Sequence, residues 1–169
     1  MAKNMESLVV NDARILFRNF AGKEGKFNPA GNRNFCLVID DTKVAKDLEE
    51  DGWNVKYLTP RDPGEEPKPY LSVKVNYSQN PPKIYMMSGK FMDASGKVRF
   101  RNHTLMDEDT IASLDYAEIE NVDIVVNPYQ WEVNGRTGVK AYVKTMYVTI
   151  ADDPFADKYY PEDDEIPFN

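Results

Sequence analysis

The residues with the clearest chemical meaning lie near the end of the chain, in GVKAYVKTMYVTI at 138–150. Alternation puts Lys140, Tyr142 and Lys144 on one face of a predicted strand and small apolar residues on the other. A tyrosine between two ammonium groups suits a single-stranded nucleic acid, because stacking is worth about 1–3 kcal/mol per base and the lysines can meet phosphates. A solvated strand face with a partly exposed tyrosine is the alternative interpretation.

Basic and aromatic residues occur together elsewhere too. The preceding segment, NPYQWEV, has Tyr129 and Trp131 at the same parity, and the hairpin turn NGRTG, which contains Arg136, joins it to the last strand. The other candidate nucleic-acid contacts in the first part of the chain are Arg14, Arg18, Lys26 and Arg33. Some of the aromatic residues must build the core, since a domain of this size needs large apolar side chains.

Short alternating segments predict most of the secondary structure as strands. In residues 70–77, YLSVKVNY, apolar and polar side chains alternate cleanly. Residues 13–18 also alternate, so we expect Phe17 on the buried face and Arg18 on the opposite, cationic face. The run FCLVID is apolar and predicts a buried strand, in which Cys36 is expected to be a small core residue.

Two short helices and two turns complete the predicted elements. Asp41 or its neighbour can cap a first helix that Gly52 ends. Asp107 can cap a second, with Ile111 and Leu114 facing inward. A further hairpin is expected to turn at DASGK.

These elements predict a mainly β fold: an OB-like, five-stranded Greek-key barrel with an extra hairpin and loops. A β-sandwich is the alternative, because periodicity does not separate the two. We expect residues 1–150 to form this domain and residues 151–169 to form a disordered acidic tail. The net charge of −7 supports the division. The tail holds seven acids and one base, so the body carries only −1 and can still present a basic face.

The sequence offers little for catalysis, so we expect no enzyme, no cofactor and no bound metal. It has one cysteine and one histidine, His103, which cannot build a zinc site. Carboxylates cluster at Asp40–Asp41 and Asp107–Asp109, but acids at a helix start complement its dipole without a metal. Phosphate-binding glycine loops and nucleophile elbows do not occur.

We expect the protein to act in the cytoplasm, without a membrane partner. No stretch approaches the roughly 20 consecutive apolar residues that cross a bilayer. The first residues, MAKNMESLVVNDARI, are polar where a signal peptide needs an apolar run.

The last residues, EDDEIPFN, combine four acids with an apolar tip. This ending resembles the acidic tip of bacterial single-stranded DNA-binding proteins, in which the phenylalanine enters an apolar pocket of a partner and the acids meet a basic rim. The chain also looks like phage-encoded single-stranded DNA-binding proteins, which share an OB-type barrel and an acidic tail. The resemblance implies a partner-binding role for Asp163, Asp164, Glu165, Ile166, Pro167 and Phe168. The bacterial tip ends on phenylalanine, whereas Asn169 follows here.

The resemblance and the basic, aromatic strand face predict the same function. We expect a protein, encoded by a phage and acting in its bacterial host, that coats single-stranded DNA during replication, recombination or repair. Its tail would recruit replication and recombination proteins and compete with DNA for a cationic groove at millimolar effective concentration. An RNA-binding OB module, a phage adaptor or inhibitor of a host protein, and a metal-dependent nuclease are the alternatives. The oligomeric state stays open.

Overall fold

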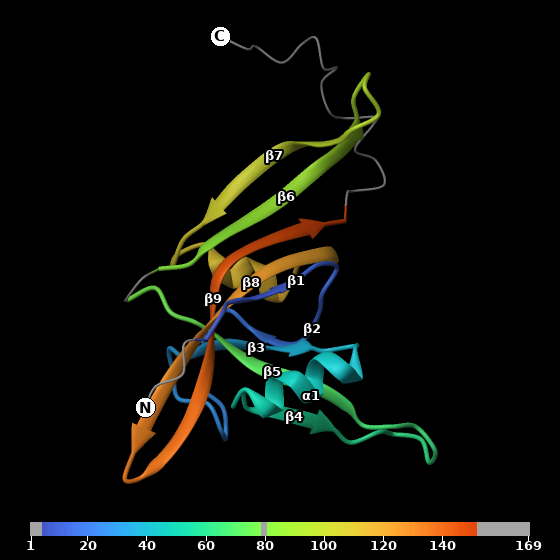
Figure 1. Ribbon diagram of the computed structural model, residues 1–169. Coiled ribbons are helices and arrows are strands. Elements are labelled where there is room, and N and C mark those ends of the chain that lie inside the picture. The colour runs from blue at the N-terminus through green and yellow to red at the C-terminus, as the bar shows by residue number, and fades with distance from the viewer. Residues whose placement is uncertain (1–4, 79–80, 152–169) are drawn as a thin grey trace.

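The computed structural model describes residues 5–78 and 81–151. Within this part, nine strands form one mixed sheet, and two helices lie beside it (Figure 1). The strands are β1 (Leu8–Val10), β2 (Arg14–Asn19), β3 (Arg33–Val38), β4 (Val55–Leu58), β5 (Lys68–Val75), β6 (Lys83–Met92), β7 (Val98–Met106), β8 (Ile119–Val133) and β9 (Arg136–Ile150). The helices are α1 (Thr42–Glu50) and the 3₁₀ helix η1 (Ile111–Asp115). The predicted acidic tail, apart from its first residue, lies outside the described residues.

Six of the strands build the barrel that the sequence predicts. The strands follow the order β1-β8-β9-β5-β3-β2, and three residues separate β1 from β2 in the chain. The Ala13 N–H donates to the Val122 carbonyl at 2.7 Å, so the end of this path returns to β8. Neighbours are antiparallel except β5 and β9, which run parallel. The expectation of an OB-like Greek-key barrel is therefore confirmed.

The barrel core is built by alternate side chains of these strands. On β9, Val139, Ala141 and Val143 are buried, as the alternation predicts. Phe20 and Phe35 pack with their ring centres 5.4 Å apart. The largest fully buried side chains are Phe20, Phe35, Leu37, Leu71, Ile84, Ile111, Leu114, Ile124 and Met146. Burial of this continuous apolar surface is the main source of stability of the fold.

The first predicted helix is present and the second is shorter than an α-helix. The Asp41 carboxylate accepts hydrogen bonds from the backbone N–H groups of Lys43 and Val44, and this caps α1. The Asp107 carboxylate accepts from the N–H groups of Asp109 and Thr110, which makes a turn, and only the five residues of η1 follow as a 3₁₀ helix. Ile111 and Leu114 in η1 are fully buried, as expected.

The hairpin of β6 and β7 extends the sheet away from the barrel (Figure 1). The first half of β6 pairs in parallel with the end of β9, from Lys83 opposite Thr145 to Met87 opposite Thr149, and the rest projects. The predicted turn at DASGK is confirmed. The Asp93 carboxylate accepts hydrogen bonds from the Ser95 hydroxyl and the Arg99 side chain, which hold the pKa of Asp93 well below its usual range.

Two predictions about side-chain orientation are wrong. A bulge interrupts β2 between Leu16 and Asn19, Phe17 takes a φ of 52°, and its ring is 69% exposed and not buried. Cys36 is half-buried and lies outside the core cluster, because its strand position faces Ser72 on the outer side of the barrel. Burial raises the pKa of its thiol. No helix in the described ranges is long and apolar enough to span a membrane.

Candidate nucleic-acid interface

The outer face of β9 carries the side chains that the sequence singled out. Lys140 and Lys144 are exposed and Tyr142 is half-buried, while the residues between them point into the core. Lys144 is the extra residue of a bulge, because Val126 on β8 pairs with Val143 and the preceding Val125 pairs with Thr145. A bulge re-aims the side chains around it, and here it leaves Lys144 on the outer surface.

The neighbouring strand β8 adds aromatic rings to this face. Tyr129 lies opposite Lys140 in the antiparallel ladder, and its side chain is 58% exposed. The rings of Tyr129 and Tyr142 meet edge to face, with centres 6.1 Å apart and planes at 82°. These two tyrosines, with Lys140 and Lys144, line an open hollow of about 860 Å³. The alternation therefore predicted a real cluster.

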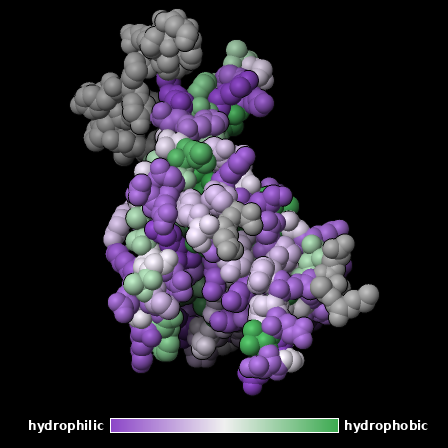
Figure 2. All heavy atoms as spheres, turned by 90° about the vertical axis from the view of Figure 1, so that its left-hand side faces the viewer, coloured by the Kyte–Doolittle hydropathy of each residue, from purple (hydrophilic) through white to green (hydrophobic). Residues whose placement is uncertain are grey.

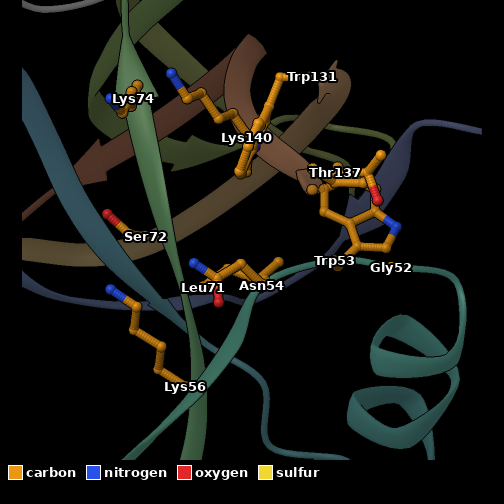
Figure 3. A pocket seen from close by; sticks show the side chains of 13 residues that line it. Gly52, Trp53, Asn54, Lys56, Leu71, Ser72, Lys74, Trp131, Thr137 and Lys140 are labelled. Carbon is orange, nitrogen blue, oxygen red and sulfur yellow. The ribbon is translucent and has the colours of Figure 1, made fainter. Parts of the chain in front are cut away.

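Trp131 closes a second hollow, of about 500 Å³, next to the first (Figure 3). Its indole lies over Gly138 on β9, where a Cβ would stand 2.6 Å from Cζ2 of the ring. Figure 3 shows Lys56, Lys74 and Lys140 with their amino groups on the side of this hollow away from Trp53. The hollow thus combines an aromatic ring with several ammonium groups.

Lys74 lies where β5 and β9 meet. It pairs with Tyr142 across the parallel contact of the two strands. Burial, and then the positive charge of Lys140, lower the pKa of Lys74. Two ammonium groups that disfavour each other's charge form a site that an anion such as a phosphate would stabilise.

A third hollow, of about 470 Å³, continues the surface past Tyr142. Arg33 lines it, 3.7 Å from the Glu108 carboxylate and with its guanidinium 6.0 Å from the centre of the Tyr77 ring. Burial raises the pKa of Tyr77 to about 12. Phe27, which is 90% exposed, also lines this hollow.

The three hollows share lining residues and so form one surface, which we call the groove. Lys74 lines the second and third hollows, Lys140 the first and second, and Tyr142 the first and third. The basic side chains along the groove are Arg33, Lys56, Lys74, Lys83, Lys140 and Lys144, and Glu108 is the one acid among the described residues that line it. The groove therefore favours a long polyanion.

The structure brings only part of the predicted contact set to the groove. Tyr129, Trp131, Lys140, Tyr142, Lys144 and Arg33 all line it. Arg136 lies beside it, in a further hollow that Trp131 also lines. The Lys26 ammonium stands 5.4 Å from the centre of the Phe27 ring, one residue from the groove lining. Arg14 is exposed but is not among the lining residues.

Arg18 has a different place. One of its terminal guanidinium nitrogens donates to the backbone carbonyls of Leu114 at 2.8 Å and Ala117 at 2.7 Å. The bulge at Phe17 turns this side chain towards η1 and away from the cationic face expected from the alternation. Carbonyls at the end of a helix need partners from outside it, so Arg18 joins β2 to the end of η1.

The set of candidate contacts predicted from the sequence lacks Lys56, Lys74 and Lys83. A signal for Lys74 was available, because the clean alternation of YLSVKVNY puts Ser72 and Lys74 on its polar side. No pattern in the sequence around Lys74 indicates that β5 pairs with β9. Among the described residues, no group of three or more histidine, cysteine, aspartate or glutamate side chains is placed to hold a metal ion.

Comparison with known proteins gives a family and a fold. The family model described as "Putative phage ssDNA-binding domain" matches residues 1–168. No curated protein sequence matches the chain. Among solved structures, the single-stranded DNA-binding protein from bacteriophage Enc34 in complex with ssDNA is similar, with a TM-score of 0.53, 14% identity, and coverage of 91% of this chain and 96% of that chain.

A C-terminal truncation of the same phage protein gives a TM-score of 0.52 with 14% identity, over 88% of each chain. At these identities the likeness concerns the fold, and it agrees with the barrel described above.

Proposed function

The chain belongs to the phage ssDNA-binding domain family, and from this we propose that it binds single-stranded DNA along the groove. The observation that carries the proposal is the continuity of the groove, in which basic side chains alternate with the rings of Trp131, Tyr129 and Tyr142. Such a surface matches the two repeating features of a single strand, its phosphates and its unstacked bases.

In this proposal the rings bind bases and the ammonium groups bind phosphates. Tyr129 and Trp131 each offer an accessible ring edge or face, and every base can stack on a ring, so binding tolerates any sequence. Lys74 and Lys140 gain the most from a phosphate between them, since it relieves their mutual repulsion. Nothing in this mechanism makes or breaks a covalent bond.

A similar structure supports DNA as the partner, since the Enc34 phage protein was solved in complex with ssDNA. The protein would then protect single strands in phage replication, recombination or repair, in the cytoplasm of the host cell. The geometry and chemistry of the groove support the choice of site residues.

We also propose a role for the acidic tail, on the grounds of sequence alone. Its net charge of −6 suits competition with DNA for the groove, and Ile166, Pro167 and Phe168 suit an apolar pocket on a replication or recombination protein. An apolar tip would not be needed if the tail served solubility only.

Fluorescence anisotropy of a labelled oligo-dT tests DNA binding and the competition of the acidic tail with DNA. The full chain is compared with a variant in which Glu162, Asp163, Asp164 and Glu165 become Gln or Asn, at low and at high salt. We expect both proteins to bind, the tail variant more tightly, and salt to weaken both steeply because phosphate binding releases counterions.

A groove variant, Tyr142→Leu with Lys140→Gln, serves as the matched test of the site. It should bind at least tenfold more weakly at low salt, since it loses one stacking ring and one phosphate contact. If the full chain fails to bind oligo-dT at low salt, the DNA-binding proposal is wrong. If it binds and the groove variant binds equally well, the DNA lies elsewhere on the protein.

A further inference from the structure

The groove does not stop at β9 but reaches the beginning of the β6–β7 hairpin. Lys83, the first residue of β6, lines the groove and pairs with Thr145 on β9. Two positions further along the same parallel ladder, Tyr85 pairs with Tyr147. Residues two apart on a strand share a face of the sheet, so Tyr85 lies on the same face as Lys83, and Tyr147 on the same face as Thr145. The outer surface of the hairpin is thus continuous with the groove.

The two tyrosines that follow Lys83 and Thr145 form a stacked pair. Their ring centres are 5.1 Å apart and their planes differ by 12°. On the other side of Tyr85, Leu105 pairs with it across the hairpin. Tyr147 is 42% exposed and Leu105 is 57% exposed, so this row is not core. It is an aromatic platform open to solvent, one step beyond the groove.

The hairpin as a whole is strongly basic. Residues 83–106 contain five lysines or arginines and one acid, for a net charge of +4, whereas residues 1–150 as a whole carry −1. That acid is Asp93, and its carboxylate accepts from the Arg99 side chain at 2.8 Å in the turn. The positive charge of the hairpin therefore exceeds what its own acid can neutralise, and it suits a phosphate chain.

The hairpin also repeats the pairing of ring and cation seen in the groove. The Arg101 guanidinium lies 5.2 Å from the centre of the Phe91 ring. Gly89 makes room for it, since a Cβ there would lie 2.8 Å from the Arg101 Cβ. Figure 2 shows hydrophilic and hydrophobic residues interleaved on the described part that projects at the top of the view. A planar cation over a ring is a typical partner for bases and phosphates of single strands.

We propose that the β6–β7 hairpin is a second DNA-binding segment. A single strand that leaves the groove past Lys144 and Lys83 would cross the stacked pair Tyr85–Tyr147 and follow the hairpin towards Arg101 and Phe91. This inference rests on the proposed function, because it extends the same DNA path. It predicts that the hairpin contributes to the binding of long strands and not to the binding of strands that fill only the groove.

Affinity as a function of strand length tests the proposal. The full chain is titrated with oligo-dT from about 4 to 16 nucleotides, the range that one OB fold covers, and with strands about twice as long. The platform variant is Tyr85→Leu with Tyr147→Leu, and the cation variant is Arg101→Gln. We expect the platform variant to bind long strands about tenfold more weakly and short strands unchanged. For long strands, Arg101→Gln should lower the salt slope by about 0.7.

Matched substitutions elsewhere control for loss of a ring or a charge. Tyr116→Leu removes a 75% exposed tyrosine at the end of η1, and Arg61→Gln removes an exposed arginine in the β4–β5 loop. Both should bind all lengths like the unmodified chain. Circular dichroism and thermal unfolding verify that the hairpin variants fold.

Cross-linking identifies the contact directly. Ultraviolet irradiation of the chain on a long oligo-dT, at one protein per strand, should give cross-linked peptides that contain Tyr85 or Tyr147, and a short oligo-dT should not. If the hairpin variants bind long strands like the unmodified chain while the groove variant does not, the hairpin inference is wrong and the groove proposal stands. The hairpin variants could also lose affinity for long strands only when two protein molecules bind one strand. In that case the hairpin contacts a second protein molecule and not the DNA, which also overturns the inference. Failure of the unmodified chain at every length overturns the proposed function itself.

Discussion

The Trp131 indole on β8 lies directly over Gly138 on β9, where even a Cβ would approach Cζ2 of the ring to 2.6 Å. The absence of a side chain at Gly138 therefore sets the position of Trp131 at the edge of the groove. Gly138 has no side chain that could contact DNA, but it positions a ring that we propose stacks on a base.

Gly138→Ala should therefore weaken DNA binding without any change of charge. The added methyl group displaces the indole, so we expect a loss of affinity for oligo-dT similar to that of Trp131→Leu, about five- to tenfold. The double variant should be no worse than either single variant, since both act through the same ring. Additive losses would mean that Gly138 acts independently of Trp131.

Intrinsic fluorescence gives an independent measurement of Trp131. The chain has two tryptophans, and Trp53 is only 5% exposed in the core. Oligo-dT should quench the emission of the unmodified chain far more than that of Trp131→Leu, in which only the buried Trp53, which lines the same hollow, remains. Quenching of equal size in the two proteins would mean that Trp131 does not stack on a base.

Lys74 should make DNA binding sensitive to alkaline pH. Burial and then Lys140 lower its pKa below the ordinary value of 10.5, and a bound phosphate would raise it again. Between the lowered pKa and 10.5 the protein must take up a proton on binding, so affinity falls as the pH rises through this window. Lys74→Arg keeps its charge throughout, and its affinity should fall less. Parallel pH profiles for the two proteins would contradict this assignment.

Lys140 and Lys144 should act through phosphates. Replacing either by Gln is expected to weaken binding equally for oligo-dT and oligo-dC, and to lower the slope of log K against log salt by about 0.7. Lys46→Gln, on the exposed side of α1, is the control and should leave the slope unchanged. A slope that stays the same in Lys140→Gln would mean that this amino group meets no phosphate.

Arg18 should affect stability and not binding. Its two hydrogen bonds to the carbonyls of Leu114 and Ala117 tie β2 to η1. Hydrogen bonds from a charged group are worth about 1.5–3 kcal/mol, so Arg18→Ala should lower the free energy of unfolding by about that amount. Urea unfolding measures the loss, and oligo-dT affinity at low temperature checks that the folded protein still binds. Reduced affinity with unchanged stability would return Arg18 to the set of DNA contacts.

Most predictions that depend on local pattern are confirmed. The alternation of residues 139–144 indicated the outward face of β9, because strand geometry fixes a period of two. Asp41 caps α1, and Asp93 organises the hairpin turn, since both effects involve a side chain and the next few backbone N–H groups. The same reasoning failed at Phe17, where a bulge, which alternation does not predict, reversed the expected faces of Phe17 and Arg18.

The sequence alone determined most strand faces, the mainly β class and the contrast in charge between an acidic end and a nearly neutral body, because period, capping and charge can be counted along the chain. Only the tertiary structure decided which faces meet. The parallel contact of β5 with β9 brings Lys74 beside Tyr142, and the pairing of β6 with β9 brings Tyr85 onto Tyr147, although about 60 to 70 residues separate the partners. Long-range pairing depends on how the whole barrel packs, and no local pattern encodes it.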